Sequence, residues 1–355
     1  MIDTAEKLAE WVPRIRAADW LALDTEADSL HAYPEKLCLI QISFPGADEL
    51  IDPLASADLS GFLDALGGRE LILHGADYDL RLLRRTYGFV PGTVFDTMLA
   101  ARLLGVVELG LTSLVEKLLG VHLEKGPQTA DWGRRPLTPR MDDYARNDTR
   151  HLKGLADLLR TRLLEKGRLG WHEESCARLV EECAELRPAD PDQVWRVKGA
   201  DKLDRRGLAM LRELWTWRDH EAVAANRPPY FVLRHETLVA VADAAAQDKP
   251  VVLLLPPRLT ARRKQGLLAS LERATELTAA QWPHRRPTSN QRPTLAEKQR
   301  YEILRQIRDR RALELEIDPT LIASRASLGA LSHDWETQQA RMMKWQRELL
   351  RGETG

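Results

Sequence analysis

The sequence predicts an α/β domain built on a mixed β-sheet flanked by helices, followed by two all-α helical domains. Over residues 20–104, short apolar runs typical of strands first come in quick succession and then alternate with helical patterns. From residue 204 onward the patterns are helical, and a polar, proline-rich stretch at 283–293 interrupts them. This order indicates a sheet domain followed by a helical half.

The composition is that of an ordinary soluble globular protein: 355 residues, of which 44% are hydrophobic and 30% charged. No apolar run approaches the roughly 18 residues of a membrane span, and no secretory signal is visible, so we expect no membrane association. The three cysteines, Cys38, Cys176 and Cys183, form no disulfide framework, which favours a reducing cytoplasm. Cys176 and Cys183 can share a helix face with His172, and we expect them to be buried packing residues.

The elements of the first half follow from periodicity and from turn residues. Helical spacing predicts helices, and compact apolar runs predict strands. Three strands in quick succession favour an antiparallel meander, whereas strands that alternate with helices favour parallel pairing, so the sheet is expected to be mixed. The predicted helices are 3–18, 58–66, 77–87 and 97–104, and the predicted strands are 20–24, 37–42, 49–52, 70–74 and 93–95.

The first candidate site lies at the end of the first strand, where Asp24 and Glu26 are two residues apart. Side chains at that spacing point to the same face of a strand. Carboxylates side by side repel each other unless a cation lies between them, and hard divalent ions take oxygen ligands of this kind. The alternative is a strand that simply continues into a polar loop.

A second group of acids lies where strand 70–74 passes into a helix, the usual place for a site in such sheets. Either Asp77 or Asp79 can face the first pair, but Asp77 can also cap the helix, which leaves Asp79 for chemistry. For His74 we favour a hydrogen-bonded structural role over a catalytic one. We expect Asp96 to cap the following helix.

A third pair lies on a helix whose start is marked by Thr138 as the cap and Pro139 at the first position. Tyr144 and Asp148 are four residues apart, which places them on one face of that helix. A tyrosine one turn before an aspartate is common by chance, so this pair carries weight only together with the other two groups.

Taken in order, Asp24-x-Glu26, His74-x4-Asp79 and Tyr144-x3-Asp148 resemble the three motifs of the DEDD superfamily of 3′–5′ exonucleases, tyrosine branch. The flanking segments, which are similar to ribonuclease D, are 34–43, 95–97 and 131–137. The resemblance runs over most of residues 1–165 and implies a ribonuclease H-like sheet. One departure is Gly126 after Lys125, where serine is frequent in the family.

The resemblance implies a metal-dependent 3′–5′ exoribonuclease that hydrolyses the 3′-terminal phosphodiester of RNA with two divalent ions, Mg²⁺ or Mn²⁺. In the family scheme, Asp24 bridges both ions, and Glu26 and Asp148 complete the site that holds the nucleophilic water. Asp79 serves the second ion through water, and Tyr144 orients the attacking water. The implied partner is RNA with a free 3′ end, with tRNA precursors as the substrate, and we expect no obligate protein partner.

Three basic residues that flank the third motif, Lys125, Arg134 and Arg135, are candidates to hold phosphates near the scissile bond. For Arg134 and Arg135 the alternative is a solvated loop. For Trp132 we favour packing over base stacking.

In the second half, residues 211–219 and 228–238 resemble the HRDC domain, and residues 316–325 resemble the second, HRDC-like domain of ribonuclease D. The family role of these modules is RNA binding. The predicted division is 1–168 for the exonuclease domain, 169–203 for a connecting helix and linker, 204–283 for the HRDC domain, 284–296 for a linker and 297–355 for the second helical domain.

Two other functions fit the same residues. A DNA exonuclease shares the carboxylates, and no residue that we can point to reads a ribose 2′-hydroxyl. A non-catalytic RNA-binding scaffold could keep the fold, but a scaffold has no need for a complete set of mutually repelling acids.

Overall fold

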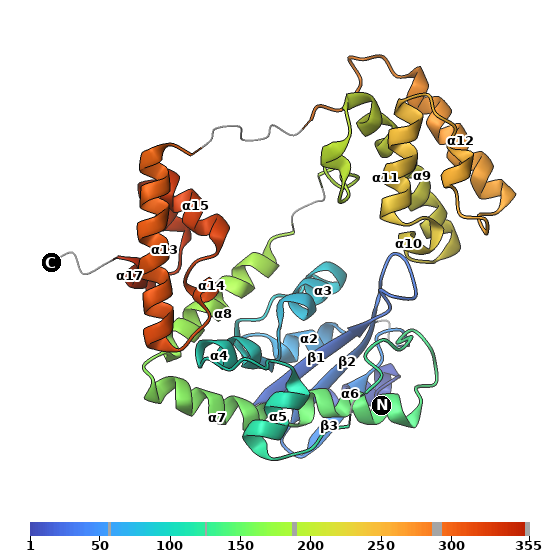
Figure 1. The fold of residues 1–355 in the computed structure, drawn as a ribbon. Coiled ribbons are helices and arrows are strands. Elements are labelled where there is room, and N and C mark those ends of the chain that lie inside the picture. Colours follow the sequence, from blue (N-terminus) through green and yellow to red (C-terminus); the bar gives the residue numbers. More distant parts are fainter. Residues whose placement is uncertain (56–57, 125, 187–189, 286–292, 352–355) are drawn as a thin grey trace. The chain divides into compact units, whose positions relative to one another are not determined.

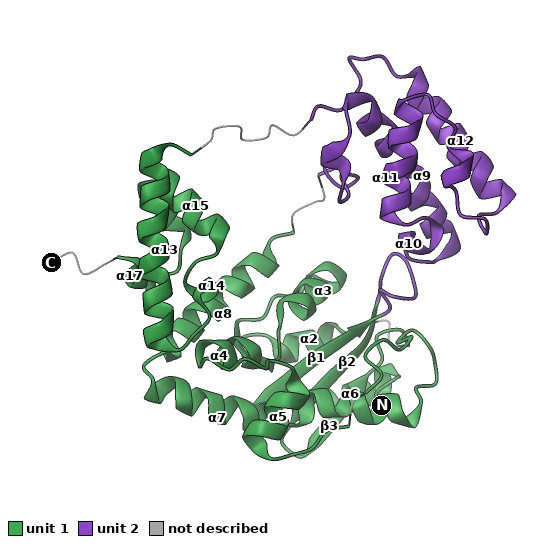
Figure 2. Cartoon of the chain, viewed as in Figure 1, with its two compact units in different colours: residues 1–27, 37–186, 291–355 green, residues 28–36, 187–290 purple. Residues whose placement is uncertain are grey.

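The structure is a computed structural model that describes residues 1–55, 58–124, 126–186, 190–285 and 293–351. The chain divides into two compact units (Figure 2). Unit 1 comprises residues 1–27, 37–186 and 291–355, and unit 2 comprises residues 28–36 and 187–290. Over the described ranges, no helix combines the length and the apolar character that crossing a bilayer requires.

Unit 1 is built on a five-stranded mixed sheet in the order β3-β2-β1-β4-β5. The central strand β1 pairs antiparallel with β2, which pairs antiparallel with β3, whereas β1–β4 and β4–β5 are parallel. The mixed sheet predicted from the sequence is therefore confirmed. The strands are β1 (Leu21–Ala27), β2 (Leu37–Phe44), β3 (Ala47–Ile51), β4 (Glu70–Leu73) and β5 (Thr93–Asp96).

Helices cover both faces of this sheet (Figure 1). Successive side chains of β1 point to opposite faces of the sheet, so Leu21 and Leu23 belong to one hydrophobic cluster and Ala22 to the other. The first cluster packs under α1 (Ala5–Ala17), α2 (Ser60–Leu66) and α3 (Asp77–Tyr87). The second packs under α4 (Thr97–Leu103), α5 (Leu111–Leu119) and α7 (Leu152–Glu165), while α6 (Pro139–Arg150) lies against β1, β2 and β3.

Helix α8 (Leu169–Ala184), which the sequence suggested was a connector, packs against α3, α4 and β5 within unit 1. His172 on α8 is buried, and its Nε2 lies 3.0 Å from the carbonyl oxygen of Asp96. Cys176 and Cys183 are buried on the same helix, as expected of packing residues. The helix is thus part of the core of unit 1.

The C-terminal helices also belong to unit 1. Ile322 and Leu328 share a hydrophobic cluster with residues of the sheet, and the indole of Trp345 stacks on that of Trp171 of α8 with 5.0 Å between ring centroids. The helices are α13 (Leu295–Leu315), α14 (Pro319–Ile322), α15 (Arg325–His333), α16 (Trp335–Gln338) and α17 (Lys344–Leu350), with a 3-10 turn at Gln339–Arg341. The sequence did not predict this shared core.

Unit 2 has its own hydrophobic core, in which Leu211 and Leu214 of its longest helix are fully buried. Its described residues form three main helices. They are α9 (Arg205–Ala225), α11 (His235–Ala246) and α12 (Ala261–Glu276), together with the short α10 (Pro229–Val232) and 3-10 turns at Ala200–Lys202 and Val252–Leu254.

The helices α9–α11 and α13–α15 repeat one local design. A long helix is followed by a four-residue helix with proline at its start and then by a third helix. In each copy a buried arginine of the long helix donates from Nη1 to a carbonyl just after the short helix. Arg218 donates to Leu233 at 3.3 Å, and Arg308 donates to Ala323 at 3.1 Å. The shared pattern supports the prediction of a second HRDC-like segment.

Candidate active site

Three of the predicted acids come together at one end of the sheet. Asp24 and Glu26 lie on β1, and Asp148 lies on α6, which packs against that strand. One carboxylate oxygen from each of the three lies within 4.8 Å of those from the other two. Residues far apart in the chain therefore form one acidic group, as their order in the sequence suggested.

Helix α6 is fixed at both ends, which sets the position of Asp148. At its start the hydroxyl of Thr138 accepts from the backbone N–H of Met141 at 3.3 Å, as expected of a cap. Near its end the hydroxyl of Thr149 is 2.7 Å from that of Ser43 on β2, in a buried hydrogen bond. Asp148 precedes this anchor by one residue.

Asp79 reaches the site from α3. The hydroxyl of Thr25 donates to its Oδ1 at 2.5 Å, and the Asp79 side chain is buried. Thr25 lies between Asp24 and Glu26 but on the opposite face of β1. The strand therefore carries two acids on one face, and on the other face its Thr25 hydroxyl binds the third acid, Asp79. The alternative role for Asp77 as a helix cap is wrong, because Asp77 is already helical and pairs with Arg81 in solvent.

Two further polar residues near the site have structural roles. The carboxylate of Asp96 caps α4 by accepting from Met98 N at 2.8 Å, and it also accepts from Ala76 N at 2.9 Å. The ring of His74 is hydrogen-bonded through Nδ1 to the hydroxyl of Thr97 at 2.9 Å. Burial lowers the pKa of His74, so the ring is neutral at pH 7. These contacts match the capping and structural roles expected of the two residues.

The acidic group is poorly solvated and strongly self-repelling. Burial, together with the charge of Asp148, raises the pKa of Asp24 to about 7, and burial together with its acidic neighbours raises the pKa of Glu26 to about 9. Burial also raises the pKa of Asp148 to about 7 and that of Asp79 well above its usual range. Without a cation these groups therefore hold protons that ordinary carboxylates release.

The residues present fit a divalent metal. Carboxylate oxygens are the donors that Mg²⁺ and similar hard cations prefer, and a bound cation removes the repulsion between them. Within the described part of the chain, the buried Oδ2 of Asp148 has no hydrogen-bond partner. A buried carboxylate oxygen that accepts no hydrogen bond is available to bind a cation.

Tyr144 lies one turn before Asp148 on α6, and the interaction with its hydroxyl partly offsets the rise in the pKa of that acid. Burial and the charges of Asp148 and Glu26 raise the pKa of Tyr144 above its usual value, so the hydroxyl stays protonated and can donate. The Tyr144 ring stacks on Trp132, with 6.1 Å between centroids. Trp132 is 1% exposed, which confirms the packing role.

The three basic candidates for phosphate contacts differ in their surroundings. Lys125 lies outside the described residues, and Arg134 is exposed. Arg135 instead holds the loop to the sheet: its guanidinium donates to both oxygens of the buried Asp52, at 2.5 and 2.7 Å, and to the carbonyl of Cys38 at 2.7 Å. These contacts favour a structural role for Arg135.

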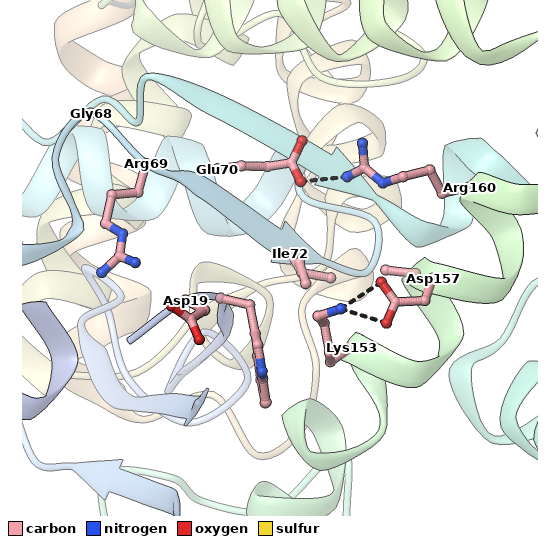
Figure 3. A pocket seen from close by; sticks show the side chains of 10 residues that line it. Asp19, Gly68, Arg69, Glu70, Ile72, Lys153, Asp157 and Arg160 are labelled. Carbon is pink, nitrogen blue, oxygen red and sulfur yellow. Dashed lines mark hydrogen bonds and ion pairs between the residues drawn. The ribbon is translucent and has the colours of Figure 1, made fainter. Parts of the chain in front are cut away.

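A pocket of about 490 Å³ lies elsewhere on unit 1 (Figure 3). Trp20 and Glu70, which line it, lie at the amino ends of the parallel strands β1 and β4, whereas the acidic group lies toward the other ends. Two ion pairs line it, Arg160 with Glu70 and Lys153 with Asp157. The pocket is separate from the acidic group.

Known proteins resemble this chain in sequence and in fold. Residues 1–164 match the 3′–5′ exonuclease family, and residues 207–253 match the HRDC domain. The chain is 33% identical to the ribonuclease D of Pseudomonas paraeruginosa over 290 residues, which are 80% of this chain and 75% of that protein. The chain belongs to the ribonuclease D family.

Two further similarities agree. The ribonuclease D of Gluconacetobacter diazotrophicus is 34% identical over 254 residues, which span 70% of this chain and 64% of that protein. The structure of Escherichia coli RNase D, described as an exoribonuclease involved in structured RNA processing, matches with a TM-score of 0.76 at 26% identity, over 99% of this chain and 98% of that chain. The family and the enzyme class predicted from the three motifs, a 3′–5′ exonuclease, are confirmed.

Two polar residues beside the acids were missed in the sequence. Thr25 hydrogen-bonds Asp79. In the sequence, the feature that could have indicated this role is a hydroxyl residue between two acids, on the other face of the strand. Gln41 is fully buried on β2 and pairs with Asp24 of β1. In the sequence, the feature that could have drawn attention to it is a single polar residue within an apolar run.

Proposed function

We propose that the protein removes nucleotides one at a time from the 3′ ends of structured RNA, with tRNA precursors as the substrate and two divalent ions, Mg²⁺ or Mn²⁺, as cofactors. The observation that supports it most directly is the convergence of Asp24, Glu26 and Asp148, with Asp79 hydrogen-bonded beside them. The match to ribonucleases D, one of them described as acting in structured RNA processing, favours RNA over DNA.

In this proposal Asp24, Glu26, Asp79 and Asp148 hold the metal ions. The ions supply electrostatic stabilisation for the attacking and leaving oxygens of an in-line displacement. Asp24, whose carboxylate interacts with both Asp148 and Asp79, would hold metal together with them. Tyr144 donates a hydrogen bond from its hydroxyl to the attacking water and so orients it. Because the hydroxyl stays protonated at neutral pH, Tyr144 does not act as a general base.

The helical segments bind the RNA beyond the scissile bond. The division into 1–168, 169–203, 204–283, 284–296 and 297–355 is part of this proposal as a division into sequence segments, since helix α8 and the C-terminal helices pack within unit 1. Residues 187–189 and 286–292 lie outside the described ranges. The match of residues 207–253 to the HRDC domain and the repeated design of α13–α15 support it. Lys125, which lies outside the described residues, and the exposed Arg134 hold phosphates in this proposal.

A labelled-RNA assay tests this function. A 5′-labelled RNA with a structured body and a free 3′ tail, incubated with Mn²⁺ or Mg²⁺, should shorten in single-nucleotide steps. Asp24→Asn should abolish the ladder, whereas Asp77→Asn should leave it intact, because Asp77 is exposed and pairs with Arg81. A matched single-stranded DNA should be degraded more slowly. An RNA that is bound but stays intact would instead indicate a scaffold.

A further inference from the structure

Gln41 is the one polar residue in the otherwise apolar segment Leu37–Ile42. Its side chain is 0% exposed, and neither its amide nitrogen nor its amide oxygen has a hydrogen-bond partner among the residues that the structure describes. A buried amide without partners is unfavourable, and groups of this kind call for a physical explanation. A hydrocarbon side chain of the same size would fill the position without that penalty.

The strand register places Gln41 beside the acidic group. Gln41 on β2 is directly opposite Asp24 on β1 in the antiparallel ladder. Residues paired in this way point to the same face of the sheet and lie side by side. Gln41 therefore projects from the face that carries Asp24 and Glu26.

Helix α6 covers Gln41 on that face. The residues two before and two after it on β2 both face α6, because Leu39 shares a cluster with Ala145 and Ser43 hydrogen-bonds Thr149. On α6, Asp148 lies between those two contact points, and its Oδ2 is also buried without a hydrogen-bond partner among the described residues. An unpaired amide and an unpaired carboxylate oxygen thus belong to the same layer between sheet and helix.

We propose that Gln41 is a positioning residue of the metal centre, whose side-chain amide donates a hydrogen bond to a metal-holding carboxylate. The inference rests on the proposed function. A carboxylate that binds a cation is ionised and is a strong acceptor, and hydrogen bonds from neighbouring groups fix which of its oxygens faces the metal. An amide suits this role because it donates a proton without carrying a positive charge that would repel the cations.

The proposal predicts different effects on metal binding and on folding. Gln41→Met removes the amide and keeps a side chain of similar length. Its melting temperature in EDTA should equal or exceed that of the wild type, because an unpaired polar group has been removed. Its Mn²⁺ affinity, measured by calorimetry on the full chain, should be about 10- to 100-fold weaker, and the Mn²⁺-induced rise in melting temperature should shrink accordingly.

Ile42→Val is the matched control, since Ile42 neighbours Gln41 on the same strand but points to the opposite core. It should lower the melting temperature and leave the Mn²⁺ affinity unchanged. Wild-type affinity in Gln41→Met would overturn the inference while leaving the proposed function in place. A large loss of melting temperature in EDTA would also overturn it, by showing that the amide serves the fold. A wild-type protein that binds no Mn²⁺ would defeat the proposed function itself.

Discussion

The backbone of Gly126 lies against the ring of Tyr144. A β-carbon at position 126 would be 1.5 Å from Cδ2 and 2.2 Å from Cγ of that ring, far closer than atoms can approach. Glycine is therefore required if the loop before α6 is to cover the tyrosine in this way. Serine is frequent at this position in the family, and this chain departs from that pattern at the point of contact.

Gly126→Ala should displace the Tyr144 ring and lower the rate of RNA trimming by about 100-fold, the cost of misplacing a catalytic group by about an ångström. Mn²⁺ affinity should stay near that of the wild type, because the acids do not move. Gly110→Ala is the control, since a β-carbon there would meet nothing within 4 Å. Full activity in Gly126→Ala would show that the loop and the ring can separate at no cost.

Tyr144→Phe should lose at least about 100-fold in the rate constant for cleavage, because the hydroxyl that orients the water is gone. The ring and its stacking on Trp132 are kept, so stability should change little. Calorimetry should show Mn²⁺ binding as in the wild type. Unchanged turnover would assign the orienting role to another group.

The metal-free protein should become less stable as the pH rises. The pKa of Glu26 is raised to about 9 in the folded state from an ordinary value of 4.5, so the folded protein binds the proton more tightly than the unfolded chain does. The stabilisation is complete below about pH 4.5 and is lost as the pH rises through about 9. In EDTA, the melting temperature at pH 8.5 should therefore fall below that at pH 5.5.

Glu26→Gln should flatten this pH dependence, since the amide does not titrate. Saturating Mn²⁺ should oppose it, because binding requires ionised acids and strengthens with pH. A wild-type slope in Glu26→Gln would mean that other groups cause the effect.

Replacing Arg135 and Arg134 in turn should distinguish a residue that stabilises the fold from one that binds RNA. Arg135→Ala leaves the buried carboxylate of Asp52 unpaired and should lower the free energy of unfolding by about 3 kcal/mol, measured in urea. Arg134→Ala should leave stability unchanged and weaken RNA binding, with a smaller dependence of affinity on salt. Normal stability of Arg135→Ala would return that residue to the candidates for phosphate contacts.

Much of the sheet domain could be predicted because local patterns determine it. The alternation of β1, the cap at Thr138 and the four-residue spacing of Tyr144 and Asp148 depend on neighbours in the chain. These local patterns predicted the strands, the start of α6 and the placement of Tyr144 and Asp148 on one face of that helix. For Asp77 the sequence left two roles open, and the structure excludes the cap because α3 already begins at Asp77.

What the sequence could not supply are relationships between distant segments. Arg135 looked like a loop cation until the structure placed the buried Asp52 beside it. The C-terminal helices looked like a separate domain, yet Trp345 stacks on Trp171 in a core shared with the sheet. Such contacts depend on how elements pack, which periodicity does not encode.

The most direct test is a crystal soaked with Mn²⁺ and a short RNA, measured for anomalous scattering at the manganese edge. We expect two peaks about 3.5–4 Å apart, held by Asp24, Glu26, Asp79 and Asp148, with the 3′-terminal phosphate beside them. Manganese bound elsewhere, or a 3′ end that lies away from these four acids, would contradict it.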